Sequence, residues 1–299
     1  MPTSFLDQLG ATNLRLFLCF VAATILTVLG SIFSFGGEFV RSGLPFFGGA
    51  LLALALASWQ INAHDRALHA ATHSYWKAFS EESVILLSTR PPDAEFEAGS
   101  RSPLTPFHDA QAGLKVQAHL EAKYETKVPI VSVGDLSDLA DIQAKNVILI
   151  GGPNLNHLTD ALMERAWVQH GDRYFHWSST LATLSSTQAT VIHSQDHFLR
   201  VQTTPNNVLT ADEVLDLHDP EGNLIEARGM CLRLEGLLGP GSRVLLLAGT
   251  ASAYGTLAAA DYALDPDNLL HLSGPDSQLI VSAALNGYGL HEPYALRVL

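Results

Sequence analysis

Two glycine-rich turns hold the side chains in this sequence that are best suited to bind a small ligand. Each turn follows a short apolar segment, predicted to be a buried strand, and precedes a segment of helical character. In α/β proteins, a strand, a glycine turn and a helix N-terminus together present backbone N–H groups to an anion. The chemistry predicted for these turns is therefore the binding of sugar or phosphate oxygens, and no catalytic residue is assigned.

The first turn follows residues 146–150 and leads into a helix predicted at residues 158–167. Its glycines permit close approach of a ligand to the backbone. Its amide and hydroxyl groups can form hydrogen bonds with sugar or phosphate oxygens. The candidate residues are Gly151, Gly152, Asn154, Asn156 and Thr159. The pattern is neither G-x-G-x-x-G nor a Walker motif, so a tight turn without a ligand is the alternative interpretation.

The second turn follows residues 243–248 and precedes a helix of small residues at 257–264. Its candidate residues are Thr250, Ser252, Tyr254, Gly255 and Thr256. A third strand, predicted at residues 83–88, ends at Thr89 and Arg90, and Arg90 is a natural cation for a phosphate. Parallel strands would bring all these residues to one carboxyl edge, where open α/β sheets bind ligands. We therefore predict one shared pocket.

Other chemistries have little support in the sequence. A nucleophile needs an adjacent base, yet no Ser-His-Asp pattern, carboxylate pair or cysteine nucleophile context is evident. His64, His69 and His73 are expected on a solvated or headgroup-facing helix, and a second group is explained by a hairpin turn. That second group consists of His193, Asp196 and His197. We predict no metal site, and the sequence identifies no cofactor.

The charge balance argues against binding to a nucleic acid polymer. The formal net charge is −13, and nearly all of it falls after residue 63. Affinity for nucleic acid comes largely from Lys and Arg side chains that neutralise phosphates. A single small anion in a local pocket remains compatible with this balance, so a nucleotide-like small molecule is the expected ligand.

Two apolar runs near the N-terminus predict a pair of transmembrane helices. The runs cover residues 14–35 and 44–63, and a bilayer core requires about 20 helical residues. The short connection at 36–43 suits a turn among lipid headgroups. Small residues within the runs would allow close helix packing, either inside one hairpin or in a homo-oligomer. The sequence thus predicts contact with membrane lipid.

The flanking charges predict an orientation for this hairpin. Arg66 and Lys77 follow the second run, whereas the connection contains Arg41 beside Glu38. Cytoplasmic flanks are usually richer in Lys and Arg, so both termini are expected in the cytoplasm of a cell with the chain in its inner (plasma) membrane. The soluble part contains one cysteine, Cys231, which is consistent with a reducing compartment.

The predicted domain organisation has three parts. Residues 1–63 form the transmembrane hairpin, residues 64–82 a juxtamembrane connector helix, and residues 83–299 an α/β ligand-binding domain. The fold class expected for the last part is a Rossmann-like mixed sheet with an antiparallel insertion. Residues 170–235 are expected to form antiparallel strands that are inserted into the main sheet or extend it, because their segments are short and strand-like. They include a hairpin formed by residues 189–193 and 198–203.

Residues 146–159 and 226–260 resemble an uncharacterised group of prokaryotic Rossmann-like domains. The shared features are a strand that ends in Gly-Gly-Pro-x-x-Asn and a later strand that ends in Ala-Gly before an alanine-rich helix. Two membrane spans followed by such a domain are similar to membrane effectors of bacterial antiphage signalling. The resemblance implies a domain that senses a nucleotide messenger and triggers membrane disruption.

Three functions are compatible with these observations. The first is a membrane-anchored sensor or effector whose α/β domain binds a nucleotide-like ligand and acts on the hairpin. The resemblance above suggests antiphage defence as its setting. The second is a membrane-tethered enzyme acting on a nucleotide or glycosidic substrate through the same pocket. The third is a membrane adaptor that binds a protein partner. The sequence favours the first, because the two glycine turns point to one ligand site.

Overall fold

The structure analysed is a computed structural model of the 299-residue chain. It describes residues 21–22, 25, 38–89, 105–142, 145–152, 155–170, 189–193, 198–202, 211–269, 276–286 and 289–298. The chain divides into two compact units, Met1–Ala70 and Ala71–Leu299. The candidate site lies entirely in the second unit.

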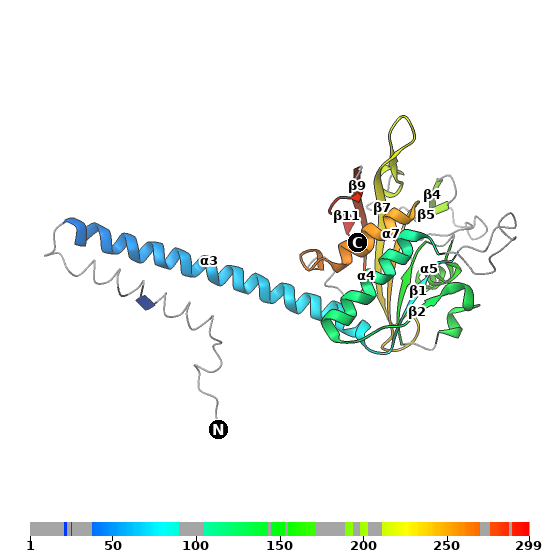
Figure 1. Ribbon diagram of the computed structural model, residues 1–299, viewed down its shortest axis with the longest axis horizontal. Helices are drawn as coiled ribbons and strands as arrows, with labels where there is room; N and C mark the ends of the chain where they lie inside the picture. Colours follow the sequence, from blue (N-terminus) through cyan, green and yellow to red (C-terminus); the bar gives the residue numbers. More distant parts are fainter. Residues whose placement is uncertain are drawn as a thin grey trace, which may run out of the picture. The chain divides into compact units, whose positions relative to one another are not determined.

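The pair of transmembrane helices predicted from the sequence is wrong. Most of the first apolar run lies outside the described residues, and the second falls inside helix α3, Glu38–Trp76 (Figure 1). This helix does not end at residue 63 but continues through Asp65 and Arg66. Among the residues that the structure describes, no helix combines the length and the apolar character needed to cross a membrane. The apolar run is one section of a longer helix of mixed composition.

A nine-stranded mixed sheet forms the centre of the second unit, in the order β10-β9-β7-β8-β3-β1-β2, with β6 paired to β7 and β11 to β9. Its parallel part consists of β1 (Ser83–Leu87), β2 (Ile130–Ser132), β3 (Asn146–Ile150) and β8 (Arg243–Gly249). Strand β3 lies between β1 and β8, with Ile148 opposite both Ile85 and Leu245. The three strands that precede the candidate residues are therefore direct neighbours.

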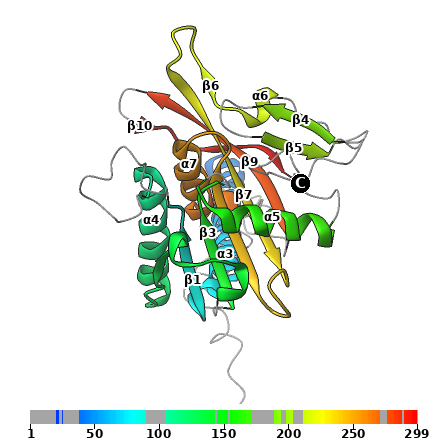
Figure 2. The same cartoon turned by 90° about the vertical axis from the view of Figure 1, so that its right-hand side faces the viewer.

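The rest of this sheet is antiparallel and corrects the predicted fold class further. It consists of β6 (Leu217–His218), β7 (Leu224–Glu235), β9 (Ser277–Asn286), β10 (Gly289–Leu290) and β11 (Tyr294–Val298). Strand β7, predicted as an antiparallel strand inserted into the main sheet or extending it, lies in a central position between β8 and β9. The result is a curled sheet, parallel on one side and antiparallel on the other (Figure 2), in place of the predicted Rossmann-like architecture.

The hairpin predicted at residues 189–203 is confirmed, but it lies outside the main sheet. Strands β4 (Ala189–His193) and β5 (Phe198–Gln202) pair with each other in a separate two-stranded sheet. The connection at 194–197, which contains the predicted turn residues Asp196 and His197, lies outside the described residues. Helix α6, Ala211–Val214, precedes β6.

Helices cover both faces of the main sheet, because its central strands are apolar on both sides. Helix α5 (His157–His170) packs on one face through Leu158, Leu162 and Met163. Helices α4 (Phe107–Tyr124) and α7 (Ala253–Leu264) cover the other face, together with the last turn of α3 and the short helix η1 (Lys77–Ser80). Two further short helices, η3 (Val133–Asp135) and η4 (Leu139–Asp141), precede β3.

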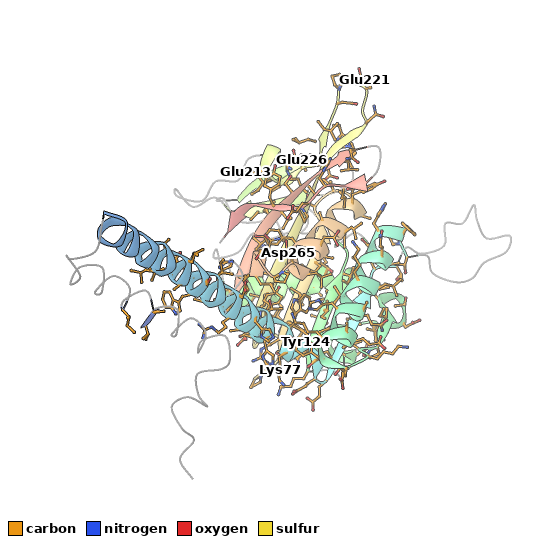
Figure 3. The ribbon with its side chains drawn as sticks, turned by 60° about the vertical axis from the view of Figure 1, so that its left-hand side comes forward. Lys77, Tyr124, Glu213, Glu221, Glu226 and Asp265 are labelled. Atoms are coloured by element: carbon orange, nitrogen blue, oxygen red, sulfur yellow. The ribbon has the colours of Figure 1, made fainter. Side chains whose placement is uncertain are left out.

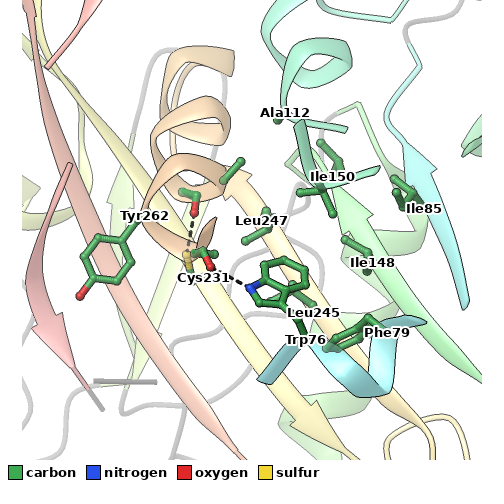
Figure 4. Close-up of a cluster of buried hydrophobic side chains, with 14 of the residues drawn as sticks. Trp76, Phe79, Ile85, Ala112, Ile148, Ile150, Cys231, Leu245, Leu247 and Tyr262 are labelled. Carbon is green, nitrogen blue, oxygen red and sulfur yellow. Dashed lines mark hydrogen bonds between the residues drawn. The ribbon is translucent and has the colours of Figure 1, made fainter. Parts of the chain in front are cut away.

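The last turn of α3 is tied to α7 inside the second core. The indole Nε1 of Trp76 donates a hydrogen bond to the carbonyl of Ala263 at 3.1 Å (Figure 4). The Cys231 thiol, on β7, contacts the carbonyl of Ala259 at 3.3 Å. Burial raises the pKa of this thiol, so Cys231 acts as a small core residue rather than as a nucleophile.

Helix α7 lies unusually close to the sheet because three glycines meet there. A Cβ atom at Gly255 would lie 1.8 Å from the carbonyl oxygen of Arg228, and a Cβ at Gly229 would lie 2.2 Å from that of Gly255. A Cβ at Gly249 would lie 1.7 Å from the carbonyl oxygen of Ser252. Each obstacle is backbone, which cannot move aside as a flexible side chain can. Glycine at these positions therefore allows the short distance between α7 and strands β7 and β8.

We predict that Gly255→Ala lowers the free energy of unfolding by about 1–3 kcal/mol, the usual cost of overpacking a core. The matched control is Gly49→Ala in α3, where a Cβ meets no atom within 4 Å. That control is expected to be neutral or stabilising by up to about 1 kcal/mol, because alanine favours helix over glycine. Urea denaturation of both variants checks this, and equal effects would contradict the close-packing argument.

Candidate functional site

The carboxyl ends of β1, β3 and β8 meet at one edge of the sheet, so the two glycine turns lie side by side as the sequence predicted. Backbone hydrogen bonds join the strand ends directly. The Ser88 amide donates to the Ile150 carbonyl at 3.0 Å, and the Gly151 amide donates to the Leu247 carbonyl at 2.9 Å. The Thr89 amide donates to the Leu155 carbonyl at 2.9 Å, which attaches the end of β1 to the first turn.

Two predicted ligand-binding residues of the first turn are engaged inside the protein. The buried Asn156 amide group accepts a hydrogen bond from the Thr159 backbone amide at 3.1 Å, as a helix N-cap does. The Thr159 hydroxyl donates to the Gly151 carbonyl at 3.0 Å. These side chains shape the turn that leads into α5. Gly152, which is half-buried, remains the position through which this turn can meet a ligand.

The second turn shows the same division between internal and accessible residues. The Thr256 hydroxyl accepts a hydrogen bond from the Gly249 amide at 2.8 Å, and the Thr250 hydroxyl donates to the Arg228 carbonyl at 3.1 Å. Both threonines are buried, and Gly255 is required by close packing. Ser252 and Tyr254 are partly exposed, but the Ser252 hydroxyl oxygen is buried, so Tyr254 is the side chain of this turn that a ligand can reach.

Two of the predicted site residues, Arg90 and Asn154, lie outside the described residues. Thr89 lies at the edge and is half-buried. The structure thus brings Thr89, Gly152 and Tyr254 to one edge as the accessible members of the predicted set, with the buried Ser252 hydroxyl beside them. The other described members of the set hold the two turns in place through internal hydrogen bonds and close backbone contacts.

Sequence reasoning missed Asp109, the most unusual side chain at this edge. Asp109 lies in the first turn of α4 and is 2% exposed. One carboxylate oxygen, Oδ2, accepts a hydrogen bond from the Ser88 hydroxyl. The other, Oδ1, accepts none within the described part of the chain. A buried carboxylate with an unsatisfied oxygen is costly to the folded state.

Gly151 places the first turn against this carboxyl group. Its φ is +103°, a conformation that side chains with a Cβ rarely adopt. A Cβ at this position would lie 2.6 Å from the Ser88 Oγ and 2.8 Å from the Asp109 Oδ2. The glycine therefore serves both the turn and the approach to Asp109. The only sign of Asp109 in the sequence was an acidic residue in the first turn of a helix. Its burial depends on the packing of that helix against the sheet, which the sequence pattern does not show.

Burial raises the pKa of Asp109, and the hydroxyl groups of Ser88 and Thr256, together with His108, offset part of this effect. Burial likewise raises the pKa of Asp216, whose Oδ1 accepts a hydrogen bond from the Arg228 amide at 2.7 Å. Asp216 lies near Ser252, whose hydroxyl acts to lower its pKa. Two carboxyl groups with raised pKa values thus flank the N-terminus of α7. Groups perturbed in this way are concentrated at functional sites.

A third acidic group of this edge is paired rather than isolated. The Arg228 guanidinium lies 2.6 Å from the Glu226 carboxylate, which also accepts hydrogen bonds from Ser282 and, at 2.6 Å, from Tyr294. Burial acts to raise the pKa of Glu226, but these bonds outweigh it and lower that pKa to about 2. Figure 3 places Glu226 toward the end of the unit that carries Glu221 and away from Tyr124.

The arrangement is better suited to binding than to covalent catalysis. A hydroxyl beside a carboxyl of raised pKa could in principle form a nucleophile and base pair. Ser88, however, is 0% exposed, so a substrate carbonyl or phosphate cannot approach its oxygen. What the edge offers a ligand is a set of hydrogen-bonding groups, two helix N-termini and a partly exposed aromatic ring, Tyr254.

We predict that Asp109→Asn stabilises the protein more at pH 7 than at pH 4. The pKa of Asp109 is raised in the folded state, whereas the unfolded value is about 3.9. Wild-type stability therefore declines as the pH rises from about 4 to the folded pKa, and the neutral amide avoids this loss. Urea denaturation at both pH values measures the difference.

The control is Asp219→Asn, because hydrogen bonds from Asn223 lower the pKa of Asp219. Asp219 contributes stability above the unfolded pKa that is lost as the pH falls through its folded pKa, so its variant should be less stable at pH 7, with little effect at low pH. Opposite signs for the two variants are expected at pH 7. Equal behaviour of Asp109→Asn at pH 4 and pH 7 would refute a raised pKa.

Comparison with known proteins identifies no family for this chain. No protein-family model, curated protein or solved structure matches it. The resemblance to prokaryotic Rossmann-like domains therefore stays a prediction from two sequence motifs. The function has to be argued from the geometry of this edge.

Proposed function

We propose that the second unit is a ligand-binding sensor domain that takes a nucleotide-like small molecule at the carboxyl edge of β1, β3 and β8. One observation carries the proposal: the two glycine turns lie side by side at this edge, where the Gly151 amide donates to the Leu247 carbonyl at 2.9 Å. The carboxyl edge of parallel strands is where open α/β sheets bind ligands.

The backbone at this edge supports the same function. Helix α5 has 14 residues and α7 has 12, and the first N–H groups of a helix have no partner within it. Both helix N-termini follow directly from strands that end at the edge. They can donate hydrogen bonds to oxygen atoms of a ligand that sits across the two turns.

The other two functions considered from the sequence receive less support. The Ser88–Asp109 hydrogen bond favours an enzyme, but the full burial of Ser88 counts against it. A protein adaptor would need no buried, unsatisfied carboxyl beside two glycine turns. The effector function through a transmembrane hairpin rested on the two spans and is not carried forward. Cellular location, contact with lipid and homo-oligomerisation stay predictions.

A shared site predicts that a change in either turn weakens the same ligand. Gly152→Val adds a branched side chain to the first turn, and Ala251→Val enlarges a half-buried residue of the second. We expect each to weaken binding about tenfold or more, since each obstructs backbone contacts worth about 1–3 kcal/mol. Isothermal titration of the full chain with adenosine, guanosine and their 5′-monophosphates measures this, after a thermal-shift screen.

The matched control is Ala140→Val, on the exposed surface of η4 just before β3 starts. It makes the same substitution as Ala251→Val but lies at the opposite end of β3, so it should leave affinity unchanged. Loss of affinity in one turn variant only would show that the turns do not share a ligand. If none of these compounds raises the melting temperature of the wild-type chain, the proposed function is wrong for this class of ligand.

A further inference from the structure

Three aromatic rings lie in the first turns of α4 and α7, beside the proposed site. The ring centroids of His108 and Tyr254 are 3.9 Å apart with 35° between the ring planes. The Phe107 and His108 centroids are 5.4 Å apart. We call Phe107, His108 and Tyr254 the aromatic shelf. Two of its members come from α4 and one from α7, so the sequence did not reveal it.

The exposure of the shelf is unusual for side chains of this size. Phe107 is 75% exposed, and His108 and Tyr254 are partly exposed. A phenylalanine in the core would bury most of its ring, whereas this one remains in solvent beside a polar edge. A single exposed apolar residue is common, but here the Phe107 ring lies edge-on to His108, with 80° between the ring planes, and His108 in turn lies against a predicted ligand-binding residue, Tyr254.

The two helices hold the shelf in place without a ligand. The Lys115 ammonium of α4 lies 2.6 Å from the Asp261 carboxylate of α7. The close approach of α7 to the sheet, set by Gly255, fixes the position of Tyr254 one residue earlier. A preformed surface loses little conformational entropy when a ligand binds. The shelf therefore has the rigidity that a stacking surface needs.

The described charged groups around the shelf are mostly acidic. Asp109 follows His108 directly, and Asp216 lies near Ser252 at the start of α7. The basic group of this region, Arg228, is buried and paired with Glu226. The charged form of either carboxyl group would repel a phosphate group placed here, whereas an uncharged aromatic ring would not be repelled.

We propose that the aromatic shelf stacks against the base of a nucleoside, and that the site prefers the unphosphorylated compound. This inference rests on the proposed function and names its ligand class. Aromatic side chains stack on any base, because every base has a π face. The competing occupant of the exposed Phe107 ring is a helical segment of a partner protein. If the ring serves only such a partner, Phe107→Ala should leave adenosine binding unchanged.

The test is isothermal titration of the full chain with adenosine, adenosine 5′-monophosphate and inorganic phosphate. Adenosine is expected to bind at least threefold more tightly than the monophosphate, and phosphate alone should not bind measurably. Phe107→Ala and Tyr254→Ala should each weaken adenosine about tenfold, the usual loss when one stacking ring is removed. Tyr254→Phe, which keeps the ring, should retain most of the affinity.

The matched control is Leu114→Ala, which removes another exposed apolar side chain from α4, two turns further along and 58% exposed. It should leave adenosine binding unchanged. If adenosine binds and Phe107→Ala behaves like Leu114→Ala, the shelf does not bind the base, although the proposed function stands. Tighter binding of the monophosphate would overturn the preference for an unphosphorylated ligand. If neither compound binds the wild-type chain, both the inference and the proposed function fail.

Discussion

The close packing of α7 against β7 and β8 is the constraint on which the rest of the second unit depends. Backbone meets backbone at Gly229, Gly249 and Gly255, with no room for a Cβ atom. This contact lets the Thr256 hydroxyl accept a hydrogen bond from the Gly249 amide. It also positions Tyr254 so that its ring contacts that of His108. A looser helix would separate the second turn from the rest of the edge.

The buried carboxyl groups show how stability and function oppose each other here. Desolvation penalises the charged forms of Asp109 and Asp216, and Asp109 keeps one oxygen without a partner in the described chain. Most buried polar groups in proteins are satisfied. Asp109 lies at the point where two strand–turn–helix units converge, and ligand binding at this edge is the explanation that we propose.

Polar and aromatic features occupy different levels of the same edge. Four polar side chains of the turns form internal hydrogen bonds that shape them: Thr250, Thr256, Asn156 and Thr159. The aromatic shelf and the half-buried turn residues remain for contact with a ligand. The candidate set predicted from the sequence thus contained both supporting and accessible residues, and hydrogen bonding separates the two.

The sequence by itself determined the strands and the two glycine turns, because apolar runs and glycines act over a few residues. The parallel neighbours β3 and β8 followed from the strand–turn–helix pattern. The sequence misled where a local pattern belongs to a larger element: the run at 44–63 is part of the longer helix α3. It also left open how the strand at 224–234 joins the sheet, and the structure places it as the central strand β7. Hydropathy over a short window cannot report how far a helix continues or which strand a segment joins.

Only the tertiary structure decided which side chains form the site. Asp109 meets Ser88, and His108 meets Tyr254, because α4 and α7 pack side by side on one face of the sheet. These contacts join residues that are distant in the chain, so no spacing or periodicity encodes them. The burial that raises the pKa of Asp109 is likewise a property of the assembled layers. The sequence placed the turns, and the packing of two helices on the sheet gave them their chemical surroundings.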